Sequence, residues 1–271
     1  MWSTTCKGAK RGDEVTIQVK AIFMTDKGRV RQNNEDNGGV FLNKDGHRLA
    51  IVADGMGGHR AGDVASSMTV TSLQEMWEQT EGIKTADDAE DWLSKHILDV
   101  NGRIFEHSQA NAECDGMGTT IEAVIVTNLF TTVAHVGDSR SYILNPSGFQ
   151  QLTEDHTLVN ELVRTGQISE QDAEHHPRKN VILRALGTEK DVKIDIKTIM
   201  FEEDDCLLLC SDGLSNKVSN EEMVRVLQNG TTLAEKATTL INMANDNGGE
   251  DNITLCILEF DDGKELGDGK C

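Results

Sequence analysis

The stretch Ala50-Ile51-Val52-Ala53-Asp54-Gly55-Met56-Gly57-Gly58-His59 joins a short apolar run to one carboxylate and a cluster of glycines. The apolar run is typical of a buried strand. Glycines after Asp54 allow the backbone to turn sharply and to bring its carbonyls close to a ligand. A carboxylate beside a bare carbonyl provides hard oxygen ligands, which suit magnesium or manganese. Taken alone, the stretch is more often a strand followed by a hairpin turn, because Asp-Gly is a common turn signal.

The recurrence of acidic residues at other predicted strand ends favours a metal site over a turn. These motifs are Glu35-Asp36, Gly137-Asp138-Ser139-Arg140, Ser211-Asp212-Gly213 and Glu250-Asp251-Asn252. Carboxylates gathered at one edge repel each other unless a cation lies between them. A pair of hard ions answers that need, and can lower the pKa of a shared water and hold a phosphoryl oxygen. Arg31 lies four residues before Glu35, and its guanidinium suits a phosphate.

Composition restricts the partners and the location of the protein. The 271 residues carry a formal net charge of −20. An acidic surface repels nucleic acid and anionic membranes, so we expect neither as a partner. An anionic substrate would need bound divalent cations to invert the local field. The sequence contains no apolar run of transmembrane length and no apolar signal-peptide core near Met1, which predicts a cytoplasmic protein.

The order of elements predicts one α+β domain over residues 15–261. We expect strands at 15–24, 38–42, 49–53, 119–126, 131–136, 141–144, 192–200, 205–210 and 253–260, and helices at 61–78, 87–109, 220–227 and 233–245. Strand runs with helices grouped between them favour a layered α+β fold. Residues 153–185 are polar and helical in pattern, with few core residues, and are expected to form a flap subdomain. Residues 1–14 and 262–271 are expected to be flexible.

In combination and order, these motifs resemble the metal-dependent serine/threonine protein phosphatases of the PPM type (type 2C). The likeness is greatest to the short bacterial branch, whose members are often encoded with a serine/threonine kinase. It covers roughly residues 20–260. The matching stretches are Arg31 to Asp36, Ala53 to His59 with Gly62, Gly118-Thr119-Thr120, Val136 to Arg140, Leu152-Thr153 with Asp155-His156, Ala185-Leu186-Gly187, Leu209 to Leu214 and Glu250 to Thr254.

The resemblance implies a four-layer α-β-β-α sandwich, in which two antiparallel sheets pack face to face and are flanked by helices. It also implies two metal ions, Mn²⁺ or Mg²⁺, at one end of the sandwich. Asp54 would bridge both ions, and the Gly55 carbonyl would bind one of them. Asp212 and Asp251 would bind the other ion.

Further site residues follow from the same resemblance. Glu35 and Asp36 would act mostly through metal-bound waters. Asp138, together with Asp212, would form the site of a third, looser ion. Arg31 would bind the phosphate of the substrate.

The resemblance also implies the reaction and its partners. A bridging water would attack phosphorus in line with the leaving serine or threonine oxygen, without a phosphoenzyme. The expected substrates are phosphoproteins that carry phosphoserine or phosphothreonine. A serine/threonine kinase is a candidate partner, and the protein is expected to be a monomer.

One departure from the family pattern concerns the general acid. Some animal relatives carry a histidine directly after the Asp-Gly, where this chain has Met56. The alternatives are a metal-bound water, His59 and His156, and the sequence does not decide among them.

Two other functions remain open at this stage. One is a catalytically inactive relative that binds phosphoproteins as an adaptor. The presence of every proposed metal carboxylate and of Arg31 disfavours it. The other is an enzyme of the same fold that acts on a small phosphoester, because the motifs would contact only the phosphate.

Overall fold

The computed structural model describes residues 18–58 and 61–261, and they form two antiparallel sheets packed face to face. One sheet contains, in spatial order, β1 (Gln18–Asp26), β11 (Ile253–Asp261), β10 (Cys206–Cys210), β7 (Arg140–Asn145) and β8 (Gly148–Gln151). The other contains β2 (Asp36–Leu42), β3 (Arg48–Met56), β5 (Ile121–Val126), β6 (Thr131–Val136) and β9 (Asp195–Ile199), and the short β4 (Gly118–Thr119) pairs with β3.

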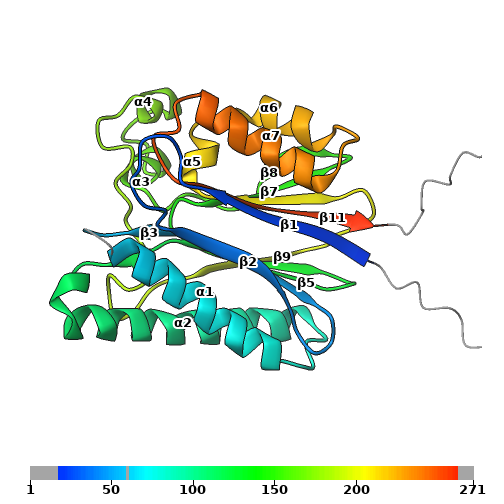
Figure 1. The fold of residues 1–271 in the computed structure, drawn as a ribbon, viewed down its shortest axis with the longest axis horizontal. Helices are drawn as coiled ribbons and strands as arrows, with labels where there is room; N and C mark the ends of the chain where they lie inside the picture. The colour runs from blue at the N-terminus through cyan, green and yellow to red at the C-terminus, as the bar shows by residue number, and fades with distance from the viewer. Residues whose placement is uncertain (1–17, 59–60, 262–271) are drawn as a thin grey trace, which may run out of the picture.

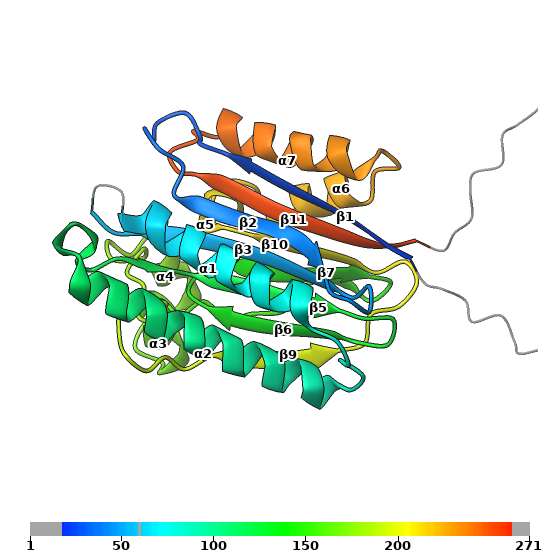
Figure 2. The same ribbon diagram turned by 60° about the horizontal axis from the view of Figure 1, so that its bottom comes forward.

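Helices cover the outer face of each sheet (Figure 1). On the sheet of β3 lie α1 (Ala61–Gln79) and α2 (Ala86–Ala110), which run side by side in Figure 2. On the sheet of β11 lie α5 (Asp212–Ser215), α6 (Asn220–Leu227) and α7 (Leu233–Asp246). The 3₁₀ turn Ala112–Cys114 follows α2, and α3 (Leu158–Arg164) and α4 (Glu170–Glu174) lie between β8 and β9. The predicted four-layer α-β-β-α sandwich is therefore confirmed.

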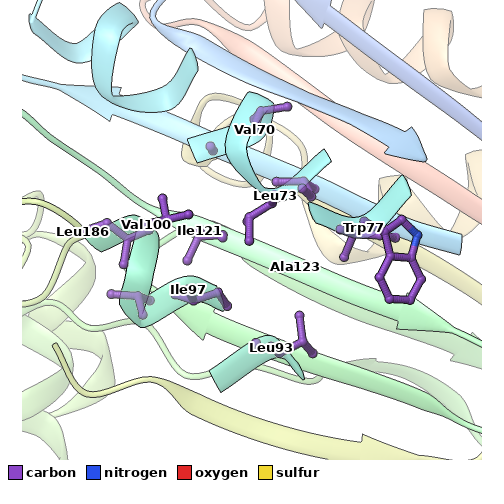
Figure 3. Close-up of a cluster of buried hydrophobic side chains, with 14 of the residues drawn as sticks. Val70, Leu73, Trp77, Leu93, Ile97, Val100, Ile121, Ala123 and Leu186 are labelled. Atoms are coloured by element: carbon purple, nitrogen blue, oxygen red, sulfur yellow. The ribbon is translucent and has the colours of Figure 1, made fainter. Parts of the chain in front are cut away.

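Two-sided burial explains why the central strands read as continuous apolar runs. On β3, Ile51 and Ala53 pack with the residues beneath α1 and α2, whereas Ala50 and Val52 pack between the sheets. Side chains alternate between the two faces of a strand, so every position of this run is buried. Figure 3 shows the layer beneath the helices, where Trp77 of α1 lies in the cluster. Its indole Nε1 donates to the Phe41 carbonyl at 3.2 Å and ties α1 to β2.

The structure changes three local expectations. Strand β3 continues to Met56, because Gly55 and Met56 pair with β4, so Asp54-Gly55 is not a hairpin turn. Asp212, which was expected at the end of a strand, begins the short helix α5. Within residues 153–185, helix is limited to α3 and α4, and the rest of the segment is turns and isolated bridges. The ends that were predicted to be flexible lie outside the described residues.

Candidate metal centre

The antiparallel register brings the predicted acidic residues to one end of the sandwich. Asp36 at the start of β2 pairs with Asp54 near the end of β3. Asp138 lies in the turn between β6 and β7. Asp212 lies two residues after the end of β10, with Ser211 between them. Asp251 lies two residues before β11, which pairs with β10. Because each of these strands starts or stops at the same end, residues far apart in sequence meet there.

An open cleft of about 330 Å³ lies at this end. The predicted site residues in its lining are Arg31, Glu35, Asp54, Gly55, Asp138, Asp212 and Asp251. The eighth, Asp36, lies behind the cleft and is 8% exposed. Its carboxylate accepts a hydrogen bond of 2.7 Å from the Ser211 hydroxyl. The residue therefore supports the wall of the cleft from within.

Two carboxylate oxygens in the cleft fit a bound cation. Asp138 Oδ1 and Asp212 Oδ1 are buried, and neither has a hydrogen-bond partner among the described residues. A buried carboxylate oxygen without a partner is costly unless a cation or a water binds it. No group of three or more acidic, histidine or cysteine side chains forms a ready-made cage in the described part of the chain. Hard ions such as Mg²⁺ keep several water ligands, so a site of one or two carboxylates per ion remains consistent with them.

Burial and mutual repulsion raise the pKa values of these carboxyls. Burial raises the pKa of Asp54 well above its ordinary value, and the charges of Asp36, Asp212 and Asp138 raise it further. The pKa of Asp36 rises to about 7 for the same first reason, although Thr254 and Ser211 oppose the rise by hydrogen bonding. Without a cation the cluster therefore retains protons near neutral pH.

This protonation predicts how the metal-free protein responds to pH. Burial and neighbouring carboxylates raise the pKa of Asp36 and of Asp138 to about 7. Between the unfolded and folded pKa values the folded state binds more protons than the unfolded state, so stability falls as pH rises. We expect the metal-free melting temperature to be lower at about pH 8 than at about pH 6. Saturating Mg²⁺ should remove this loss, because the cation replaces the protons.

Differential scanning calorimetry at both pH values, with EDTA and with Mg²⁺, provides the measurement. Asp138→Asn should reduce the pH dependence of the metal-free protein, because one titrating group is lost. A metal-free melting temperature that is flat or rises over this pH range would contradict the account.

Close approach of backbones explains two glycines of the site. A Cβ on Gly55 would lie 2.2 Å from the Gly62 carbonyl oxygen at the start of α1 and 2.5 Å from that of Glu35. A Cβ on Gly213 would lie 1.9 Å from the Asn252 carbonyl oxygen. These contacts are too short for any side chain. The glycine at 55 thus serves strand–helix packing, rather than the sharp turn that the sequence suggested.

Arg31 lies at the mouth of the cleft. Its Nη2 donates to Asp251 Oδ2 at 2.8 Å, and its side chain is 49% exposed. Within the described residues, the Arg31 guanidinium makes this one hydrogen bond. A guanidinium has five N–H donors, so others remain for a ligand in the cleft.

The structure also reveals a pair that the sequence did not indicate. Arg140 Nε and Nη2 donate to Asp155 Oδ1 and Oδ2 at 2.9 Å and 2.7 Å. This bidentate pair joins β7 to the segment after β8, and both residues line a second cavity of about 540 Å³ next to Asp138 and Asp212. Both residues belong to matching motifs, but their contact depends on the register of β7 and β8.

Among the side chains considered as general acids, His156 is held away from the cleft. Its Nδ1 accepts from the Gly137 N–H at 3.1 Å, and its Nε2 lies 3.0 Å from Asp195 Oδ2. Burial and the neighbouring His135 lower the pKa of His156 to about 4. It is therefore a poor proton donor at neutral pH. Met56 lines the cleft without an ionisable group, and His59 lies outside the described residues.

Comparison with known proteins identifies the family. The family model described as protein phosphatase 2C matches residues 26–254. The chain belongs to the protein phosphatase 2C family. The serine/threonine phosphatase stp of Listeria monocytogenes serotype 4b is 53% identical over 243 residues, which cover 90% of this chain and 96% of that protein.

Solved structures of 2C phosphatases show the same fold. Serine/threonine phosphatase Stp1 from Staphylococcus aureus has a TM-score of 0.86 and 38% identity, over 93% of this chain and 99% of that chain. The catalytic domain of the phosphatase PstP, solved in complex with two manganese ions, has a TM-score of 0.79 and 33% identity, over 90% and 99% of the two chains.

This chain is a protein serine/threonine phosphatase of a metal-dependent family. The comparisons support catalytic activity rather than the inactive adaptor. Its substrates are phosphoproteins. None of the helices in the described ranges has the length and apolar character that a membrane span requires.

Proposed function

We propose that this 2C phosphatase hydrolyses phosphoserine and phosphothreonine at the cleft, with two ions of Mn²⁺ or Mg²⁺ and a looser third. Asp54, the Gly55 carbonyl, Asp212 and Asp251 are the proposed ligands of the two ions. The observation that carries the proposal is that these residues line one cleft with Asp138, where two carboxylate oxygens have no hydrogen-bond partner within residues 18–58 and 61–261. When bound, the ions would supply an activated water as the nucleophile and positive charge for the phosphoryl oxygens.

The remaining acidic residues have supporting roles in this proposal. Asp138 and Asp212 lie beside the second cavity as well as the cleft, which suits a third ion between them. Glu35 and Asp36 would hold waters of the two ions. The Glu35 carbonyl accepts from the Gly55 N–H at 3.2 Å and from the Ser66 hydroxyl at 2.6 Å, so this turn is anchored to β3 and α1.

Arg31 is proposed to orient the phosphate. With one Nη2 bond to Asp251, it can share its other donors with two phosphoryl oxygens. Arg31→Ala should mainly raise KM for a phosphopeptide, about tenfold or more, because a charge-assisted bidentate contact is lost. Steady-state kinetics with saturating metal measures this effect. Arg103→Ala is a suitable control, because Arg103 is a half-exposed arginine paired with Asp99 on α2. An unchanged KM would argue against phosphate contact.

We further propose that the segment 153–185 is a flap within a single domain spanning residues 15–261. Asn180 and Ile182 line the cleft, and residues of α3 and α4 line the second cavity. A flap placed there would contact the polypeptide of the substrate near the phosphorylated side chain. A serine/threonine kinase as partner, a monomeric state and a cytoplasmic location complete the proposal, on the basis of the sequence.

Phosphate release from a phosphothreonine peptide tests the proposed reaction. The assay is run with Mn²⁺, with Mg²⁺ and with excess EDTA. Turnover should require added metal and should stop with EDTA. Release that persists in EDTA, or a folded protein that is inactive with both metals, would overturn the proposal.

A further inference from the structure

A buried acid–imidazole pair lies between the two sheets, apart from the proposed metal ligands. Glu122 on β5 and His135 on β6 are opposite each other in the register and are 0% and 1% exposed. Glu122 Oε1 and His135 Nδ1 form an ion pair. From the other sheet, the Ser141 hydroxyl donates to Glu122 Oε2 at 2.5 Å. The carboxylate is therefore bound from both sheets at once.

The neighbours of the two ring nitrogens favour protonation of His135. Its Nε2 lies 3.0 Å from the Glu154 carbonyl oxygen, which can only accept, so Nε2 carries a hydrogen. Its Nδ1 faces the Glu122 carboxylate, which also accepts. Both ring nitrogens thus face oxygen atoms, an arrangement that favours the imidazolium form when Glu122 is ionised. Burial opposes this charge, but the Glu122 carboxylate raises the pKa of His135 above its ordinary value.

His156 extends the network to the turn that carries Asp138. Its ring lies against that of His135, with centroids 4.5 Å apart and planes inclined by 33°. The His156 Nδ1 accepts from the Gly137 backbone N–H at 3.1 Å, and the backbone N–H of His156 donates to the Gly137 carbonyl at 2.7 Å. Two hydrogen bonds therefore connect the start of the flap segment to the residue before Asp138.

We propose that Glu122 and His135 are positioning residues, which hold the chain at Glu154–His156 and, through it, the turn that presents Asp138 to the cleft. Asp155, between Glu154 and His156, is the bidentate partner of Arg140 and is held by the same stretch. This inference rests on the proposed function, since it acts on the proposed site. It also predicts a property of the folded chain that does not depend on turnover.

A purely structural role makes a different prediction. If the pair only stabilised the fold, its loss would lower the melting temperature without a local effect on the flap. A control for the chemical change exists in the Lys236–Glu259 pair, where Lys236 Nζ lies 2.5 Å from Glu259 Oε1 and the two side chains are 8% and 26% exposed. Glu122→Gln and Glu259→Gln make the same chemical change in the two pairs.

Hydrogen exchange measured well below the melting temperature compares the two variants. In E122Q, we expect the amides of residues 137–139 and 154–157 to exchange about tenfold faster than in the wild type. Exchange of the amides in the β-strands should be unchanged. E259Q should leave these amides unchanged. With saturating Mg²⁺, kcat of E122Q for p-nitrophenyl phosphate should fall roughly tenfold or more, at constant KM, as for other residues that orient ligands indirectly.

The wild type supplies a test that needs no variant. Nitrogen-15 spectra of histidine-labelled protein, metal-free and with Mg²⁺, should show both nitrogens of His135 protonated between about pH 6 and pH 8. A neutral His135, unchanged exchange in E122Q, or equal acceleration in E259Q would each overturn the inference. If E122Q does not fold, Ser141→Ala should accelerate the same amides, and its failure to do so would also overturn it. These readouts stay informative even if the proposed phosphatase assay fails.

Discussion

Replacing Asp54 by asparagine should lower turnover by at least about 10³-fold, which corresponds to roughly 4 kcal/mol of lost transition-state stabilisation. The reason is that Asp54 is the proposed bridge between the two ions. Asparagine keeps the shape of the side chain but removes the charge that holds a divalent cation. The metal-free variant should also melt at a higher temperature than the wild type near pH 8. Asparagine carries no charge and needs no proton there, whereas burial and the charges of Asp36, Asp212 and Asp138 raise the pKa of Asp54 and make its ionisation costly.

These two effects separate a metal ligand from a residue needed for folding. Turnover is measured with Mn²⁺ and with Mg²⁺, metal binding by titration calorimetry, and melting in EDTA. Asp54→Ala should be equally inactive. Asp99→Asn is the matched control, because Asp99 is a half-exposed acid on α2 paired with Arg103. It should keep both turnover and stability. An active Asp54→Asn enzyme, or one that binds two ions with unchanged affinity, would exclude the bridging role.

Replacing Asp138 by asparagine should lower kcat by about 10²-fold and leave the two tighter ions in place. Its Oδ1 is buried without a partner among the described residues, and it lies with Asp212 beside both cavities. Asparagine retains one oxygen but loses the charge, so a loosely held third ion should be lost first.

Titration calorimetry distinguishes this result from a general loss of metal binding. The two tight binding events should persist in Asp138→Asn, and the third, weaker event should disappear. Loss of the tight events would show that Asp138 belongs to the main pair of sites. A normal kcat would show that the third site does not contribute to turnover.

The sequence alone was sufficient for the fold class and the family. Runs such as 49–53 are apolar at every position because both faces of β3 are buried, and that property is visible without coordinates. The acidic motifs are local as well, since each joins a strand end to one or two carboxylates. Their recurrence at several strand ends was sufficient to predict that they meet. The metal-binding roles of the individual residues remain predictions.

Contacts between distant residues required the tertiary structure. Gly55 looked like a turn residue, but β3 continues through it, and the Gly62 carbonyl approaches too closely for a side chain. Arg140 and Asp155 lie 15 residues apart and meet only because β7 and β8 pair.

The Glu122–His135 pair shows the same division most clearly. In sequence, Glu122 is an acid inside an apolar strand, and nothing nearby indicates its partner. Its environment depends on which residue of β6 lies opposite and on how closely the second sheet approaches with Ser141. Side-chain types and their spacing follow from the sequence directly. Strand register and sheet packing are collective properties of the folded chain, and they alone decided which charges are buried together.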